Sequence, residues 1–490
     1  MSAHRMSNAD AAWLHMDRPT NLMVVNSLLW FDEPLDFERA REVVRERLVE
    51  RFPRFHQRIA EPRLGIGVPS WEDDPGFDLD LHIHRVALSA PGDKAELQAL
   101  VADIMVAPLD RSKPLWDMYV IDGYGGGTAV LTRIHHCIAD GIALARVLLS
   151  LTDTQPEAGL SPPAPEHHGG PLSALTGPAR MGVHAAEAAL HEGVELVAHP
   201  QPEMTRLLER SAAQGRALAK LLLTSPDAPS VLRGRLGVAR RVAWTDPIDL
   251  AEVKAIGAAT DATVNDVLLS AMTGALHRYL AGRGSLVDEI RAMVPFNLRP
   301  LEEPLPRDLG NRFGLVYLSL PVGLADAGER LAEVHRRMDA IKHSPEGMLS
   351  YAILGLMGAT PVPVEQRLID VFTPKTTAVM TNVAGPREPV YFAGSRVAGV
   401  LGWVPASGEI GLGVSIFSYH GGVTIGLQVD AGLVPDPQTI IDAFSEELAV
   451  LSTLRRRRKP RTGRTRKPRA KARRREPMEL RERPEGWSIR

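Results

Sequence analysis

The chain of 490 residues contains a single cysteine, Cys137. An intrachain disulfide is therefore excluded, and the cysteine content gives no indication of an oxidising compartment. No apolar run approaches the roughly 18 residues of a membrane-spanning helix. The first ten residues, MSAHRMSNAD, lack the apolar core of a secretory signal. We therefore expect a cytoplasmic protein whose contact with any membrane is peripheral.

Charge is nearly balanced over the whole chain but not along it. The formal net charge is −2, yet residues 455–475 hold 14 lysine or arginine residues and no acidic residue. Residues 1–454 carry 40 basic and 55 acidic residues, a net charge of −15. An acidic globular part is therefore followed by a basic tail.

Length and composition predict the organisation of the chain. A chain of this length exceeds one typical domain. Proline and glycine are frequent over 155–180, which is typical of a linker, and apolar spacing over 181–224 predicts two helical pieces. We expect an N-terminal domain over 1–154, a linker and helical crossover over 155–230, a C-terminal domain over 231–454 and a disordered basic tail over 455–490.

Helix and strand patterns are mixed in both halves, which predicts the α/β (α+β) class. Strands are expected at 21–31, 116–121, 128–135, 289–296, 313–320, 377–383, 397–404, 411–419 and 423–430. Helices are expected at 37–52, 93–107, 141–151, 248–258, 264–281 and 435–452. His420-Gly421-Gly422 predicts a hairpin loop between the last two strands.

The segment RIHHCIADGIAL at 133–144 carries the clearest chemical pattern. His136 follows a predicted strand, and imidazole suits a general base because its ordinary pKa lies near neutrality. Side chains alternate along extended backbone, so His135 should point away from His136. Asp140 precedes a predicted helix and can cap its first N–H groups. Gly141 permits close backbone approach or a positive φ.

Other readings of this segment remain open from these residues alone. A structural histidine pair beside a capping aspartate would give the same pattern. A metal site is disfavoured, because adjacent histidines rarely bind one ion and no third ligand stands at a recognised spacing. The chain also lacks G-x-S-x-G, and the glycines at 125–127 are not followed by G-K-[ST]. Serine nucleophile chemistry and a phosphate-binding loop are therefore unsupported.

The motif H-H-x-x-x-D-G resembles the active-site signature shared by chloramphenicol acetyltransferase, nonribosomal-peptide condensation domains and the bacterial wax ester synthase/diacylglycerol acyltransferase family. Six further segments resemble blocks of the last family, in order: SNADAAWL at 7–14, PLDRSKPLW at 108–116, TVNDVLLSA at 263–271, VPFNLRP at 294–300, LGNRFG at 309–314 and TNVAGP at 381–386. Several motifs in one order are far more specific than one motif alone.

This resemblance implies two chloramphenicol acetyltransferase-like domains, each a mixed sheet flanked by helices, joined by a long helical crossover. It implies a tunnel between them, with the catalytic histidine midway. The implied reaction moves a long-chain acyl group from acyl-CoA to diacylglycerol, to a long-chain alcohol, or to both. Acyl-CoA is then a co-substrate, and no metal or other cofactor is implied.

The resemblance also implies roles for the motif residues. His136 is the general base, His135 its supporting partner, and Asp140 with Gly141 structural. Cys137 stands beside the base, where a thiol invites a covalent mechanism, but the family transfers the acyl group directly.

Four more residues are assigned by the resemblance or by their place near the motif. Arg58 resembles the arginine that pairs with the motif aspartate in related folds. Asn265 and Asp266 are expected to line or support the site. Trp116 is expected to pack near the catalytic turn rather than to contact substrate.

Two other functions compete with this interpretation. A related acyltransferase of the condensation type would use an amine or a polyketide hydroxyl as acceptor, although no carrier domain is recognisable in the chain. An inactive lipid-binding relative would keep the fold without turnover, and the retained His136, Asp140 and Gly141 speak against it.

The basic tail at 455–475 has its own alternatives. Pro460 and Pro468 interrupt any helix, so disorder is expected. Polybasic segments gain about 1 kcal/mol per Lys or Arg at an anionic lipid surface. Contact with the inner membrane face or with lipid droplets would suit an enzyme of apolar substrates. Charge alone also allows nucleic-acid binding, which we do not expect, or a solvated tail without a partner.

A truncation after Leu454 tests the tail. If the tail tethers the protein, the full chain should float with anionic liposomes, and the truncated chain should lose most of this binding because the basic charges are gone. Flotation with neutral liposomes is the control. Equal flotation of both chains would exclude a tethering role.

Overall fold

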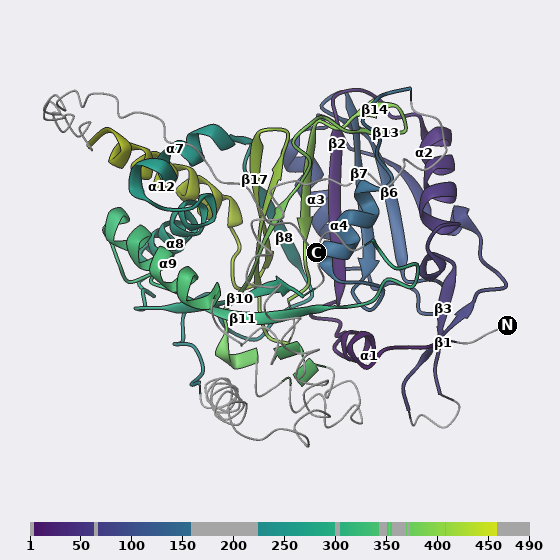
Figure 1. Ribbon diagram of the computed structural model, residues 1–490, viewed down its shortest axis with the longest axis horizontal. Coiled ribbons are helices and arrows are strands. Elements are labelled where there is room, and N and C mark those ends of the chain that lie inside the picture. The colour runs from purple at the N-terminus through teal and green to yellow at the C-terminus, as the bar shows by residue number, and fades with distance from the viewer. Residues whose placement is uncertain are drawn as a thin grey trace, which may run out of the picture.

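The computed structural model describes residues 4–62, 67–157, 224–298, 304–342, 373–406 and 408–457, together with 350–351, 353–354 and 369. Two mixed sheets lie side by side with helices packed against them (Figure 1). This arrangement confirms the predicted mixed α/β class. Apart from Thr224, the predicted helical crossover at 181–224 lies outside the described residues, as does the tail beyond Arg457. None of the described helices is long and apolar enough to cross a bilayer.

The N-terminal sheet has five strands in the order β15-β2-β7-β6-β5. They are β15 (Gly399–Trp403), β2 (Val24–Phe31), β7 (Gly127–His135), β6 (Trp116–Tyr124) and β5 (Ile83–Ala87). Only β5 and β6 pair in parallel. The middle strand β7 is buried along its whole length, so the residues that follow it begin inside the protein.

Helices cover both faces of this sheet. Leu28 of β2 and its cross-strand partner on β7 pack against α3 (Lys94–Met105). Val25, which has the opposite parity and therefore the opposite face, packs in the core that contains α2 (Phe37–Val44) and α4 (Gly141–Leu149). Helix α1 (Asn8–His15) is joined to the same core.

The C-terminal sheet has seven strands, in the order β11-β10-β12-β16-β17-β8 with β9 paired to β17. Its strands are β11 (Phe313–Leu320), β10 (Ile290–Asn297), β12 (Ala378–Ala384), β16 (Leu412–Tyr419), β17 (Gly422–Asp430), β8 (Arg240–Trp244) and β9 (Ile248–Asp249). Figure 1 shows α7 (Leu250–Thr260), α8 (Val264–Gly282), α9 (Ala327–Lys342) and α12 (Pro437–Arg457) gathered on the side away from the N-terminal sheet. One apolar core joins these helices to the sheet.

Most predicted elements are present within a few residues of their expected ends. The predicted hairpin loop is a two-residue turn, in which His420 and Gly421 have φ of 44° and 79°, as a type I′ turn requires. The helix expected over 37–52 instead changes to π-helical turns at Arg45–Val49. Helix α9 and the short strands β1 (His4–Arg5), β3 (Gln57–Ala60), β4 (Ser70–Asp73), β13 (Tyr391–Phe392) and β14 (Ser395–Arg396) were not expected.

Strand β15 belongs to the N-terminal sheet although the sequence division placed residues 397–404 in the C-terminal domain. It pairs antiparallel with β2, from Gly399 opposite Trp30 to Trp403 opposite Asn26. Alternation predicts that a segment is a strand but not which strand will be its neighbour. Strand β15 thereby connects the C-terminal half of the chain to the N-terminal sheet, at the edge of that sheet that faces the C-terminal sheet.

A substitution at Gly399 tests the packing of β15 against β2. A Cβ at this position would lie 1.9 Å from the Trp30 ring, whereas a Cβ at Gly402 of the same strand would come no nearer than 3.3 Å to any atom. We expect Gly399→Ala to lower the free energy of unfolding by about 1–3 kcal/mol, as overpacking does. Gly402→Ala is the matched control and should cost less. Equal thermal melting of the two variants would contradict the tight β15–β2 contact.

Candidate active site

The turn between β7 and α4 carries the histidine motif. Strand β7 ends at His135, and α4 begins at Gly141 with Asp140 as its N-cap. The N–H of His136 donates to the carbonyl of Met23, at 2.7 Å. This bond fixes the start of the turn against the residue that precedes β2.

His136 projects into a closely packed aromatic environment. Its side chain is 4% exposed. The ring of Trp13, from α1, stacks on the imidazole with centroids 4.1 Å apart and planes 21° apart. Phe313, at the start of β11, lies 5.4 Å away in a tilted contact. The imidazole therefore packs against aromatic rings from both halves of the chain, and these two rings also contact each other, with centroids 5.7 Å apart.

Burial controls the protonation of His136. The pKa of its imidazole is lowered to about 3, chiefly by removal from water and also by the neighbouring His135. The backbone carbonyl of His136 itself and the side chain of Asn311 act in the opposite direction. The imidazole is therefore neutral near pH 7, the state in which it can accept a proton. Its Nδ1 has no hydrogen-bond partner of normal geometry within the described residues.

His135 points elsewhere, as the alternation predicts. The N–H of Cys137 donates to Nδ1 of His135 at 3.1 Å, which leaves the proton of the neutral ring on Nε2. That Nε2 lies 3.9 Å from a carboxylate oxygen of Asp17. Cys137 is fully buried, and burial raises the pKa of its thiol well above the ordinary value. A protonated, enclosed thiol gives no support to a covalent cysteine mechanism.

Asp140 has contacts in both halves of the chain. One carboxylate oxygen accepts from the N–H of Ala143 at 2.8 Å, as a helix cap does, and the other from the N–H of Arg312 at 3.1 Å. Gly141 has no positive φ, so that part of the expectation is wrong. A Cβ on Gly141 would lie 3.4 Å from Val404, an ordinary van der Waals contact, so close approach does not require a glycine here either.

A cavity with a volume of about 130 Å³ reaches His136 and is lined from both halves. Its walls are mainly apolar and come from α4, β2 and β15 on one side and from β10, β12 and β16 on the other. Besides His136 and Asp140, the polar residues that line it are Asn26, Ser27, Thr152, Asn297, Thr381 and Asn382. Such a space suits an apolar chain with one reactive polar group beside the imidazole.

Asn265 and Asp266 lie behind the cavity rather than in its lining. Asn265 accepts a hydrogen bond at 2.9 Å from Asn382, which does line the cavity. Asp266 forms a capping box with Thr263 at the start of α8 and lies 2.7 Å from Nδ1 of His335. Neither residue therefore lines the cavity; Asn265 contacts a residue that does, and Asp266 caps the start of α8.

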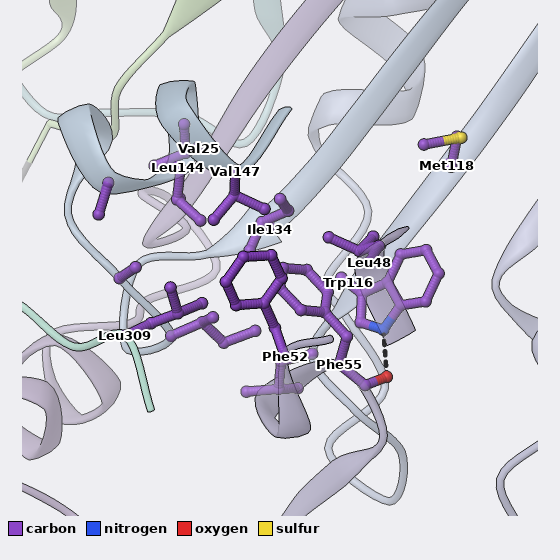
Figure 2. Close-up of a cluster of buried hydrophobic side chains, with 14 of the residues drawn as sticks. Val25, Leu48, Phe52, Phe55, Trp116, Met118, Ile134, Leu144, Val147 and Leu309 are labelled. Atoms are coloured by element: carbon purple, nitrogen blue, oxygen red, sulfur yellow. Dashed lines mark hydrogen bonds between the residues drawn. The ribbon is translucent and has the colours of Figure 1, made fainter. Parts of the chain in front are cut away.

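Trp116 is buried in the core, where it was expected to pack. Figure 2 shows its indole among Leu48, Phe52 and Phe55, with its N–H donating to the carbonyl of Phe55 at 2.8 Å. Its exposed fraction is 0%, and it does not line the cavity.

The expected pairing of Arg58 with Asp140 is wrong. Arg58 lies in β3 and donates to Glu72 of the adjacent strand β4, at 2.8 Å. The backbone N–H groups of Ala143 and Arg312 bind the Asp140 carboxylate instead. The sequence offered no means of telling which carboxylate Arg58 would meet, because Glu72 becomes its neighbour only through strand pairing.

Trp13, Asn311 and Phe313 contact His136, and Asp10 contacts Asn311; none of these four was singled out as a site residue by sequence reasoning. Asn311 donates from its side chain to the carbonyl of His136, at 2.8 Å, and to Asp10, also at 2.8 Å. The only signal was that these residues fall within the SNADAAWL and LGNRFG blocks.

Comparison with known proteins identifies the family of the chain. The family model described as "Wax ester synthase/diacylglycerol acyltransferase catalytic domain" matches residues 6–268, and "WS/DGAT C-terminal domain" matches residues 309–452. The chain belongs to the wax ester synthase/diacylglycerol acyltransferase family. As a member of this family it is an acyltransferase of lipid biosynthesis.

Individual relatives agree with this membership. A Mycobacterium tuberculosis protein named "Probable diacyglycerol O-acyltransferase tgs1" is 30% identical over 426 residues, which span 83% of this chain and 86% of that protein. The solved wax ester synthase/diacylglycerol acyltransferase from Marinobacter aquaeolei VT8 has a TM-score of 0.66 at 23% identity and covers 92% of this chain and 99% of its own. The first condensation domain of the calcium-dependent antibiotic synthetase has a TM-score of 0.59 at 15% identity, covering 93% and 97%. These two structures show a shared chloramphenicol acetyltransferase-like fold.

The buried imidazole should make stability depend on pH. In the unfolded chain His136 binds a proton near pH 6.5, but in the folded chain only near about 3. Between these values the unfolded state holds more protons, so the free energy of unfolding falls as the pH falls. We expect the wild-type melting temperature to drop more between about pH 7 and about pH 5 than that of His136→Gln, which has no imidazole at this position. Parallel pH profiles would contradict the neutral buried ring.

Proposed function

We propose that this acyltransferase moves a long-chain acyl group from acyl-CoA to the hydroxyl of diacylglycerol, of a long-chain alcohol, or of both, with His136 as general base. The observation that carries the proposal is a neutral, buried imidazole beside an apolar cavity between the two halves. The names of the family and its relatives supply the substrate class.

The chemistry requires only a base and a place for both substrates. His136 takes the proton of the acceptor hydroxyl as its oxygen attacks the thioester carbonyl, which forms the new C–O bond. The tetrahedral intermediate then collapses, the C–S bond breaks, and the CoA sulfur leaves with the proton from the imidazolium. No metal, redox group or covalent acyl-enzyme is needed for this balance.

Asp140 has a structural role in the proposal. Its carboxylate caps α4 and binds the N–H of Arg312, so it holds the turn that presents His136. Asn265 does not line the cavity, and we give it a supporting role through Asn382, whose side chain donates to it.

Peripheral lipid contact through residues 455–475 is part of the same proposal. It is supported by the 14 basic residues of this segment and by the apolar nature of the proposed acceptors.

A condensation-type reaction on an amine is the second candidate. The shared fold is the observation that favours it. The condensation domain supports it less strongly, because its TM-score is lower than that of the Marinobacter enzyme and its identity is only 15%. Assays with palmitoyl-CoA and hexadecanol, diacylglycerol or a long-chain amine separate the candidates, with thin-layer chromatography of the products.

His136→Ala is the direct test of the base. We expect its turnover to fall by about 10²–10⁴-fold, the usual contribution of a positioned general base. The melting temperature must be measured on the same sample, so that loss of activity is not loss of fold. Turnover close to that of the wild type would remove His136 as the base.

A further inference from the structure

Asn311 lies where three segments meet. Its backbone N–H and its side-chain amide both donate to one carboxylate oxygen of Asp10, at 3.0 and 2.8 Å. The same side-chain nitrogen donates to the carbonyl of His136, at 2.8 Å. Asp10 belongs to α1, His136 to the catalytic turn and Asn311 to the segment before β11. One amide therefore connects the beginning of the chain, the proposed base and the C-terminal half.

The three groups are shielded from water. Asp10 and Asn311 are each 6% exposed and His136 is 4% exposed. Burial raises the pKa of the Asp10 carboxyl, while hydrogen bonds from Ser7 and from Asn311 act against this rise. Water cannot readily replace a bond lost here, so removal of one partner leaves a buried polar group unpaired.

The segment 310–312 lies alongside the catalytic turn and is bonded to it through backbone N–H groups. The N–H of Gly310 donates to the carbonyl of Ile138 at 3.0 Å, and the N–H of Arg312 to the carboxylate of Asp140 at 3.1 Å. Asn311 reaches the turn through its side chain, so this contact can be removed by substitution without removing a backbone N–H.

Helix α1 links this contact to the imidazole. Asp10 and Trp13 are three residues apart on α1 and therefore lie on one side of it. Asp10 holds Asn311, and Trp13 stacks on the ring of His136. A displacement of Asn311 would therefore disturb His136 in two ways. It would change the bond to the His136 carbonyl, and it would move Trp13, which stacks on the imidazole ring.

We propose that Asp10 and Asn311 form a positioning pair for His136, in which Asp10 orients the Asn311 amide and Asn311 holds the carbonyl of His136. The inference rests on the proposed function of His136. Neither residue contacts the reacting atoms. The backbone N–H of His136 is thereby held by Met23 and its backbone carbonyl by Asn311.

Asn311 also affects the pKa of the His136 ring. The side-chain oxygen of Asn311 and Nδ1 of His136 are both buried without a hydrogen-bond partner of normal geometry among the described residues. The Asn311 side chain is nevertheless one of the groups that raise the pKa of His136.

Steady-state kinetics of Asn311→Ala test the pair, with Asn21→Ala as a matched control. Asn21 is also a buried asparagine that donates across the two halves, to the carbonyl of Gly408 at 3.1 Å, but it does not contact the turn or line the cavity. We expect kcat of Asn311→Ala to fall by about 100-fold, with KM for acyl-CoA nearly unchanged, since small misplacements of a catalytic group have effects of this size. Asn21→Ala should keep its kcat while losing melting temperature.

Two variants of Asp10 examine its part. Asp10→Asn retains an oxygen that can accept from Asn311, so it should keep most of the kcat. Asp10→Ala removes the acceptor and should resemble Asn311→Ala. Asn311→Asp loses the donor to the His136 carbonyl and adds a charge beside Asp10, so it should be at least as impaired.

Equal loss of kcat in Asn311→Ala and Asn21→Ala would overturn the proposal, because the amide would then serve only to hold the halves together. If the wild-type chain transfers no acyl group, the proposed function fails, and the pair is judged by NMR of 15N-labelled histidine with His136→Ala for assignment. A changed imidazole tautomer or position in Asn311→Ala, but not in Asn21→Ala, would support the pair. An unchanged His136 signal would reject it.

Discussion

The backbone of His136 is held from both halves of the chain, and the site depends on this arrangement. Its N–H is bound by the residue before β2, and its carbonyl by Asn311, which lies 175 positions away in sequence. Asp140 closes the other end of the turn against the N–H of Arg312. The turn therefore has its conformation only when the halves are packed, and a cavity exists there only in the same state.

Burial gives the imidazole its protonation state and also limits it as a base. A pKa of about 3 keeps the ring neutral at all ordinary pH values, but it also means that imidazolium is poorly solvated in this site. The oxyanion that forms during acyl transfer would place a negative charge beside that cation, and their attraction in a medium of low dielectric offsets the lost hydration. An apolar cavity thus favours proton transfer only when charge develops on substrate at the same time.

The local features of the chain were predictable from sequence because they depend on neighbouring residues. Alternation places strand β7 and separates His135 from His136, and Asp140 stands at the position of a helix cap. The resemblance to the family located the turn and its candidate base. The packing of Trp116 also followed from its size and apolar surroundings.

Sequence alone therefore determined most of the elements, the capped turn, the candidate base and the family, because periodicity, capping and motif order are properties of short segments. Tertiary structure alone decided that β15 joins the sheet of the other half, that Arg58 meets Glu72 instead of Asp140, and that Asn311 reaches the His136 carbonyl. These contacts depend on which buried surfaces pack together over long separations in the chain. No spacing within a segment encodes that choice.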